Sequence, residues 1–275
     1  MGVLDGKSAI VTGSARGIGR ATAELLVSQG AQVLINDLDG DIAEQASQEI
    51  QGETAVFSGD LTKGDAPERL VRKAIDSFGK IDIIVNNAGY TLDAPVHKMT
   101  DAQFQAMLDI HTVVPFRVIR AAAPHLREPA KKEREEGREV FRKIVNVSST
   151  SGTFGNAGQA NYSAGKAAVV GLTKTVAKEW GQFKINVNAV AFGFIDTRLT
   201  QAKVDENTME KDGETIQLGI PEQMRQMASM LIPLGRPATP EEAAGGVFFL
   251  CSPWSNYVHG QTLHITGGLF GGMSG

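Results

Sequence analysis

The sequence predicts an α/β fold with a doubly wound parallel sheet, and three observations support this class. Short apolar runs of strand length alternate with longer segments of helical periodicity along most of the chain. A glycine-rich turn at residues 13–19 joins the first expected strand to the first helix. Polar residues follow one strand after another at the end that becomes the carboxyl edge of a parallel sheet, where such sheets bind ligands.

The composition is that of an ordinary globular protein, with 275 residues, 42% hydrophobic and 21% charged. A net charge of −4 does not favour nucleic acid or an anionic membrane as a partner. The single cysteine, Cys251, excludes an internal disulfide and fits a reducing compartment. No apolar run approaches the roughly 18 residues of a membrane span. The first strand begins too close to Met1 for a signal peptide, so we expect a cytoplasmic protein.

The first half of the chain contains four expected strands, at 8–12, 32–36, 54–58 and 81–85. Gly30 has the position of a C′ residue that ends the first helix. The spacing of Val71, Ile75 and Phe78 gives the helix after the third strand one apolar face. These elements form successive β-α-β units.

A long helix is expected from Thr100–Asp101 to Leu126, with a kink or broken turn at Pro115. The segment 127–142 carries dense mixed charge, which predicts a solvated extension or loop without chemistry. Three more strands, at 144–147, 185–190 and 258–266, bring the expected total to seven. The capping-box sequence Thr239–Glu242 predicts a helix start.

We expect one domain, 1–275, that carries both the dinucleotide site and the catalytic site. The polar segment at about 194–232 has no clear periodicity, and it follows a strand at the carboxyl edge of the sheet. Long insertions at this edge often cover a binding site, so we expect a substrate lid there. Its methionines are interpreted as packing residues of that lid.

The turn at 13–19 predicts a dinucleotide site. Gly13, Gly17 and Gly19 permit a tight turn, close approach of a phosphate, and close packing of helix on strand. Asp37 ends the next strand, roughly 20 residues further on, where a carboxylate binds ribose hydroxyls. A 2′-phosphate there would meet like charge, at a cost on the order of a few kcal/mol. We therefore expect NAD rather than NADP, although Arg16 in the turn argues the other way.

Two further strand ends carry groups that can reach the same ligand. Asp60 follows the third strand, where its carboxylate either accepts from an adenine amino group or caps the next helix. The paired amides of Asn86 and Asn87 can bond to backbone on both sides of the fourth strand, and Gly89 lets a cofactor approach. A plain turn is the alternative for this last segment.

A hydroxyl, a phenol and an ammonium are expected to converge near the fifth strand. Ser149 follows that strand, whereas Tyr162 and Lys166 are four apart and share one helix face. A tyrosine can exchange a proton with a carbinol oxygen only if its pKa of about 10 falls towards neutrality. At roughly 4 Å and an effective dielectric near 20, Lys166 supplies about 4 kcal/mol. This corresponds to at most about three pKa units. Ser149 would hold the substrate oxygen beside the phenol.

At these residues the chain resembles the short-chain dehydrogenase/reductase family. The shared motifs are Thr12-Gly13-xxx-Gly17-x-Gly19, Asn86-Asn87-Ala88-Gly89, Ser149 and Tyr162-xxx-Lys166, in order and with usual spacing. The resemblance implies a Rossmann-type, seven-stranded parallel sheet of order 3-2-1-4-5-6-7 with helices on both faces. It also implies that Ser149, Tyr162 and Lys166 are catalytic. No metal is expected, because no His, Cys or Asp cluster has ligand spacing.

The resemblance further implies which residues contact the cofactor. Lys166 would bind the nicotinamide ribose, Asp60 and Leu61 the adenine, and Ile195 and Thr197 the carboxamide. The full set of expected cofactor-binding residues is Gly13, Ser14, Arg16, Gly17, Ile18, Gly19, Asp37, Leu38, Asp60, Leu61, Asn87, Ala88, Gly89, Tyr162, Lys166, Ile195 and Thr197.

The sequence departs from the family pattern at two positions. His111 occupies the place of an asparagine that supports a water relay to the lysine. A histidine there can itself relay protons near neutrality, or can be a packed residue, and both interpretations stay open. Phe192 stands where Pro-Gly is usual, which puts the rigidity of the local backbone in doubt.

Within the family, the segments 152–166 and 233–237 most resemble 3-oxoacyl-thioester reductases. His111 and the segment 155–162 also resemble (3R)-hydroxyacyl-CoA dehydrogenases, which use NAD. We therefore expect an NAD(H)-dependent oxidoreductase of an acyl thioester. The alternatives are a dehydrogenase of a steroid, sugar alcohol or other secondary alcohol, and a non-catalytic NAD-sensing regulator. By analogy with the family we expect a homotetramer or homodimer formed through the long helices.

Overall fold

A central sheet of seven parallel strands organises the computed structural model, which describes residues 2–203, 207–211 and 213–269. The strand order β3-β2-β1-β4-β5-β6-β9 confirms the predicted order, with β9 as the seventh strand. The strands of this sheet are β1 (Ser8–Thr12), β2 (Gln32–Asp37), β3 (Thr54–Ser58), β4 (Ile83–Asn86), β5 (Arg142–Ser149), β6 (Ile185–Phe192) and β9 (Thr262–Ile265).

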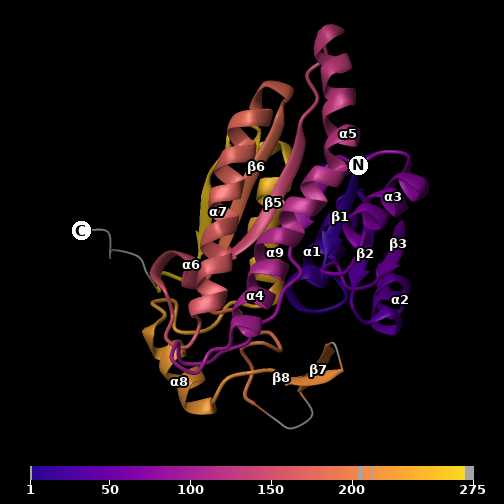
Figure 1. Ribbon diagram of the computed structural model, residues 1–275. Helices are drawn as coiled ribbons and strands as arrows, with labels where there is room; N and C mark the ends of the chain where they lie inside the picture. Colours follow the sequence, from indigo (N-terminus) through magenta and orange to yellow (C-terminus); the bar gives the residue numbers. More distant parts are fainter. Residues whose placement is uncertain (1, 204–206, 212, 270–275) are drawn as a thin grey trace.

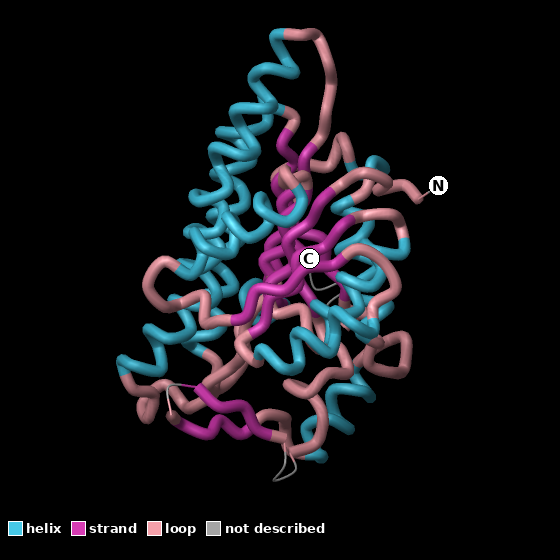
Figure 2. The backbone as a smooth tube through the Cα atoms, turned by 90° about the vertical axis from the view of Figure 1, so that its right-hand side faces the viewer, coloured by secondary structure: helices cyan, strands magenta, loops and turns pink. Residues whose placement is uncertain are grey.

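Helices cover both faces of the sheet, as expected (Figure 2). Because a buried parallel strand points alternate side chains to opposite faces, Ile10 belongs to the core cluster on one face of the sheet and Val11 to the cluster on the other face. No helix among the described residues is long and apolar enough to cross a membrane. The α-helices are α1 (Gly17–Ser28), α2 (Gly40–Glu49), α3 (Ala66–Phe78), α4 (Asp101–Leu108), α5 (Val114–Glu135), α6 (Thr150–Phe154), α7 (Ala160–Trp180), α8 (Glu222–Leu231) and α9 (Pro240–Cys251).

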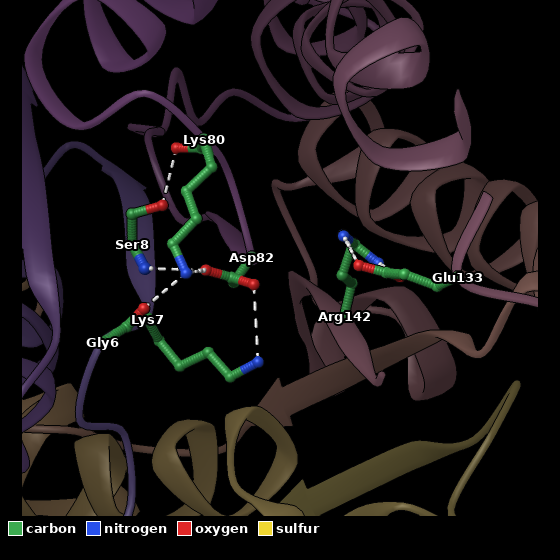
Figure 3. Close-up of polar contacts among 7 residues, drawn as sticks. All are labelled: Gly6, Lys7, Ser8, Lys80, Asp82, Glu133 and Arg142. Carbon is green, nitrogen blue, oxygen red and sulfur yellow. Dashed lines mark hydrogen bonds and ion pairs between the residues drawn. The ribbon is translucent and has the colours of Figure 1, made fainter. Parts of the chain in front are cut away.

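Ion pairs to buried or largely buried carboxylates join strand ends at the amino edge of the sheet (Figure 3). The Asp82 carboxylate accepts from the backbone N–H of Ser8 at 3.1 Å, and it pairs with Lys7 at 3.4 Å and Lys80 at 3.1 Å. At the start of β5, Arg142 donates to both carboxylate oxygens of Glu133, at 2.7 and 2.9 Å. These contacts fix the strand ends that lie opposite the ligand-binding edge.

Local signals for helix ends are confirmed. Thr239 and Thr100 each form a capping box with the residue three positions on, Glu242 and Gln103 respectively. Gly30 has φ 93° and follows the C-cap of α1 as predicted. The predicted break near Pro115 is a π-helical turn, Asp109–Val113, and the proline lies in the first turn of α5.

The largest errors in predicted extent concern α5 and the last strand. Helix α5 continues past Leu126 to Glu135 and extends beyond the rest of the fold (Figure 1). Burial of Leu126 and Ala130 on one side allows its charged residues to stay in water on the other, so the solvated extension is helical. The last strand is shorter than predicted because only Thr262–Ile265 pair with β6.

The insertion at 194–232 is more regular than the sequence suggested. It contains an antiparallel hairpin, β7 (Thr208–Lys211) and β8 (Glu214–Gln217), followed by α8. Figure 1 shows both parts at the carboxyl edge of the parallel sheet. The Asp-Gly dipeptide at 212–213 is the sequence signal that predicts such a hairpin. Methionine side chains differ within the insertion: Met209 packs on the core, but Met227 and Met230 are exposed.

Candidate active site

A cleft of about 600 Å³ lies along the carboxyl edge of β1 to β4. Its walls come from the loops that follow these strands and from the insertion after β6, so the topology gathers residues that are far apart in sequence. The expected cofactor-binding residues that line it are Gly13, Arg16, Gly17, Ile18, Gly19, Asp37, Leu38, Asp60, Leu61, Asn87, Ala88, Gly89 and Thr197.

In the glycine turn, the backbone of Gly13 lies directly against the backbone of Gly19 at the start of α1. Gly13 and Gly17 have φ 62° and 55°, in the left-handed region that favours glycine. A Cβ on Gly19 would lie 2.1 Å from the carbonyl oxygen of Gly13, so no side chain fits there. The first-turn amides of α1 are thereby held at the cleft, where a helix N-terminus favours a phosphate.

The turn after β4 is bonded to the glycine turn. The side-chain amide of Asn87 donates to the carbonyl oxygens of Thr12 and Gly13, both at 2.9 Å. In return, the Thr12 hydroxyl accepts from the backbone N–H groups of Asn87 and Ala88, both at 3.0 Å. Asn86 bonds to Asn146 on β5 at 2.8 Å. The two amides therefore join the strand end to its neighbours on both sides, as interpreted from the sequence.

Asp37 lies at the end of β2 with its carboxylate in the cleft wall. Burial raises its pKa, and bonds from the backbone N–H groups of Ala15 at 3.1 Å and Leu38 at 2.9 Å act in the opposite direction. Ser14, by contrast, is fully buried, and its hydroxyl donates to Val11 and accepts from the backbone of Asn36. The structure thus directs Ser14 away from the cleft, although it stands in the glycine turn.

Asp60 faces the cleft and does not cap the next helix, whose N-cap is Asp65. One carboxylate oxygen accepts from the backbone N–H and hydroxyl of Thr62 at 2.9 and 2.7 Å, and the other pairs with Lys211 of the hairpin. Burial alone would raise the pKa of this carboxyl, but the Lys211 and Thr62 contacts outweigh it and the pKa is lowered. The helix-cap interpretation was wrong.

Ser149, Tyr162 and Lys166 come together near the cleft but do not line it; His111, which meets the Tyr162 ring, lies against Gly89 of the cleft wall. Ser149 ends β5, and Tyr162 and Lys166 lie one turn apart in α7, which packs on that strand. The Lys166 ammonium donates to the carbonyl of Val147 at 2.7 Å and lies 5.6 Å from the centre of the Tyr162 ring. The Ser149 hydroxyl lies close enough to the Tyr162 phenol to lower the pKa of that phenol. The predicted convergence of these three groups is therefore present.

The direction of the predicted tyrosine shift was wrong for this structure. Burial raises the pKa of Tyr162 to about 12, Asp93 adds to the rise, and the nearby Ser149 hydroxyl only partly opposes it. Burial also lowers the pKa of Lys166 to about 7, so the lysine carries only part of its charge at neutral pH. The sequence spacing suggested that attraction to Lys166 would lower the pKa of Tyr162, but loss of hydration on burial is the larger effect on the pKa of both side chains.

His111 lies between Gly89, which lines the cleft, and Tyr162. Its side chain is buried, Nε2 lies 2.8 Å from the carbonyl oxygen of Tyr90, and its ring meets the Tyr162 ring edge-on at 4.9 Å. Because a carbonyl only accepts, Nε2 carries the proton and Nδ1 is an acceptor, which has no partner among the described residues. Burial and the nearby Lys166 hold the pKa of His111 well below 6.5, so the ring is neutral.

The sequence missed Asp93 and Gln159, two residues near the reacting groups. The Asp93 carboxylate accepts from the side-chain amide of Gln159 at 3.0 Å, and the Gln159 carbonyl oxygen accepts from Ser151 at 3.0 Å. Gln159 lies in the segment 155–162, in which no catalytic role is predicted for it, and Asp93 lies in a loop without a motif, so only the fold reveals their position. Ile195 is buried and bridges to Ala238 without lining the cleft, whereas Phe192 is buried at the end of β6.

A nucleotide-sized cleft with a glycine turn, next to a Ser-Tyr-Lys group, defines the class of α/β oxidoreductases that use a dinucleotide. A family profile described as "Enoyl-(Acyl carrier protein) reductase" matches residues 13–270. The chain belongs to the short-chain dehydrogenase/reductase family, as the sequence motifs predicted, and the family implies an NAD(P) cofactor.

Curated relatives match the chain over nearly its full length. It is 37% identical to a 3-oxoacyl-[acyl-carrier-protein] reductase FabG of Thermotoga maritima over 269 residues, which cover 97% of this chain and 98% of the relative. It is 38% identical to the protein of that name from Vibrio cholerae over 268 residues, with the same coverage. For the Aquifex aeolicus protein of that name the identity is 36% over 271 residues, covering 97% of this chain and 98% of the relative.

Proposed function

We propose that this protein is an NAD(H)-dependent oxidoreductase that interconverts 3-oxoacyl and 3-hydroxyacyl thioesters. The observation that carries the proposal is the grouping of the Ser149 hydroxyl, the Tyr162 phenol and the Lys166 ammonium next to His111, which lies against Gly89 in the wall of the cleft that contains the glycine turn. The similarity to 3-oxoacyl-[acyl-carrier-protein] reductases supports an acyl thioester as the substrate. Either an acyl carrier protein or coenzyme A can present such a thioester.

The chain's own residues supply the proton chemistry of this reaction, and a bound nicotinamide supplies or accepts the hydride. In this proposal the Tyr162 phenol is the proton donor to a carbonyl oxygen, which requires bound ligands to bring its pKa down from the value of about 12 to which burial raises it. Ser149, whose hydroxyl lies near the Tyr162 phenol, would hold that oxygen beside the phenol.

Two features of the cleft support NAD over NADP. Asp37 presents a carboxylate where the adenosine ribose would bind, and a 2′-phosphate would meet like charge there. Arg16, the cation in the glycine turn that would favour NADP, forms an ion pair with Asp39 at 3.4 Å. We therefore propose that Asp37 sets the preference for NAD.

We also propose a homotetramer or homodimer. Helix α5 and the turn before it expose apolar side chains, with Phe116 44% and Val113 39% exposed, and Phe104 on α4 is 38% exposed. Sedimentation at several protein concentrations tests this. A monomer at all of them would contradict the proposal.

A substrate panel tests the proposed reaction. The purified protein is given NADH or NADPH with acetoacetyl-CoA, a diketone, a steroid ketone or crotonyl-CoA, and oxidation of the nucleotide is followed by absorbance. We expect the fastest turnover with NADH and acetoacetyl-CoA. Faster reduction of crotonyl-CoA would instead indicate an enoyl-thioester reductase. Faster reduction of the steroid ketone or the diketone would show that the substrate is another secondary alcohol or ketone and not an acyl thioester. Tight NADH binding without any turnover would favour a non-catalytic NAD sensor.

A further inference from the structure

The insertion after β6 divides into two parts that serve different ends of the cleft. Helix α8 is held near the end of β6 by Arg225, which donates to both oxygens of Asp196 at 3.1 Å. The hairpin β7–β8 extends in another direction (Figure 1), and all four residues of β7, Thr208–Lys211, line the same cavity as Asp37 and Asp60. The pairing of Lys211 with Asp60 places the end of β7 at the loop after β3, where the proposed function puts the adenosine.

An apolar face seats the hairpin on the body of the fold. Met209 and Ile216 are directly opposite each other in the two strands, and both pack against the core cluster that contains Leu61 and Tyr90. Leu218, just after β8, is buried. A hairpin of two four-residue strands is not stable alone, so these contacts determine its position.

Polar contacts hold the two ends of the hairpin differently. At its base, Arg198 donates to the side-chain oxygen of Asn207 at 3.0 Å and to the carbonyl of Thr208, and the backbone N–H of Leu218 donates to Asn207 at 2.8 Å. At the far end of β7, Lys211 pairs with Asp60, which belongs to the loop after β3. The side chains of this pair are only 9% and 17% exposed, so solvent screens it weakly.

We propose that the hairpin β7–β8 is a clamp over the adenosine half of the dinucleotide, and that the Lys211–Asp60 pair is its latch. The inference rests on the proposed dinucleotide-dependent function. Adenosine bound between Asp37, Asp60 and β7 leaves only after the hairpin has moved away, so breaking the latch speeds release of the cofactor. Truncating one member of a buried charge pair acts mainly on the dissociation rate. The clamp thus acts on the cofactor, whereas α8 remains the part of the insertion nearer the substrate.

The dissociation rate of NADH tests the clamp without any turnover. NADH is displaced from the protein by excess NAD in a stopped-flow instrument, and its fluorescence is followed. Lys211→Met removes the latch, and a second variant replaces residues 208–217 by Gly-Gly, which can join Asn207 to Leu218 because these residues are already hydrogen-bonded. Lys174→Met, on the exposed side of α7, is the control for loss of a lysine charge.

We expect Lys211→Met to release NADH about tenfold faster and the excised variant faster still, with Lys174→Met within about twofold of the parent chain. Calorimetry should show weaker binding of ADP-ribose in both hairpin variants and unchanged binding of nicotinamide mononucleotide. If Lys211→Met releases NADH within about twofold of the parent rate, the Lys211–Asp60 pair does not act as a latch. If the folded excised variant also does so, the hairpin does not act as a clamp on the cofactor. Failure of the parent chain itself to bind NADH or NADPH overturns the proposed function.

Discussion

Replacing Gly89 by alanine should force His111 from its place, because the added Cβ would lie 2.3 Å from Cε1 and 2.8 Å from Nδ1 of that ring. The ring has little freedom to move away. It is 3% exposed, it bonds to the carbonyl of Tyr90, and it meets Tyr162 edge-on. Overpacking of this kind costs about 1–3 kcal/mol of the free energy of unfolding. Displacement of the ring should also disturb Tyr162 and lower turnover.

A double-mutant cycle isolates this contact. In a His111→Ala background the ring is absent, so Gly89→Ala should cost close to nothing, and the coupling free energy should be about 1–3 kcal/mol. Urea unfolding of the four proteins at one fixed protein concentration gives the values. Gly171→Ala is the matched control, since its Cβ would meet nothing within 4 Å in α7. An equal cost of Gly89→Ala in both backgrounds would refute the reasoning.

Three further predictions follow from the site and its supports. Asp37→Ser should raise kcat/KM with NADPH relative to NADH by at least about tenfold, by removing like charge from the 2′-phosphate position; an unchanged ratio would contradict this. Burial lowers the pKa of Lys166 from 10.5 to about 7, so between these values the unfolded chain binds more protons and stability rises with pH. Urea unfolding from pH 7 to 9 should therefore show up to about 1.4 kcal/mol per pH unit more rise for the parent than for Lys166→Met, and parallel curves would contradict it. Glu133→Gln should cost about 3 kcal/mol in urea unfolding, because it leaves the Arg142 guanidinium, 7% exposed, without its charged partner; a loss below about 1 kcal/mol would contradict that.

The sheet and the glycine turn could be predicted because their signals are local. A parallel strand buried on both faces must be apolar along its length, and the segments Ile10–Val11 and Ile144–Val145 show this directly in the sequence. The turn at 13–19 requires glycine for reasons of backbone geometry that hold in any such fold. The carboxyl edge then gathers the polar residues that follow each strand.

The parts that could not be predicted depend on tertiary packing. The Asp-Gly dipeptide at 212–213 indicates a turn, but the residues around it are mostly polar and show no strand pattern. The apolar pair Met209 and Ile216 can be recognised as a packing face only once the hairpin lies on the core. The pKa of Tyr162 depends on how deeply its ring is buried and on the nearby Asp93 carboxylate, neither of which spacing reveals. The end of α5 was misplaced because charged residues cover one face of a helix whose other face is buried.

The most direct test of the central claim is a single-turnover measurement with Tyr162→Phe. Parent and variant are saturated with NADH and mixed with acetoacetyl-CoA, with Tyr257→Phe, whose side chain is fully exposed, as the control. If Tyr162 is the proton donor, the reduction rate should fall by about two to four orders of magnitude in Tyr162→Phe, with NADH affinity and the control unchanged. A Tyr162→Phe rate close to that of the parent chain would contradict the assignment of this tyrosine as the acid.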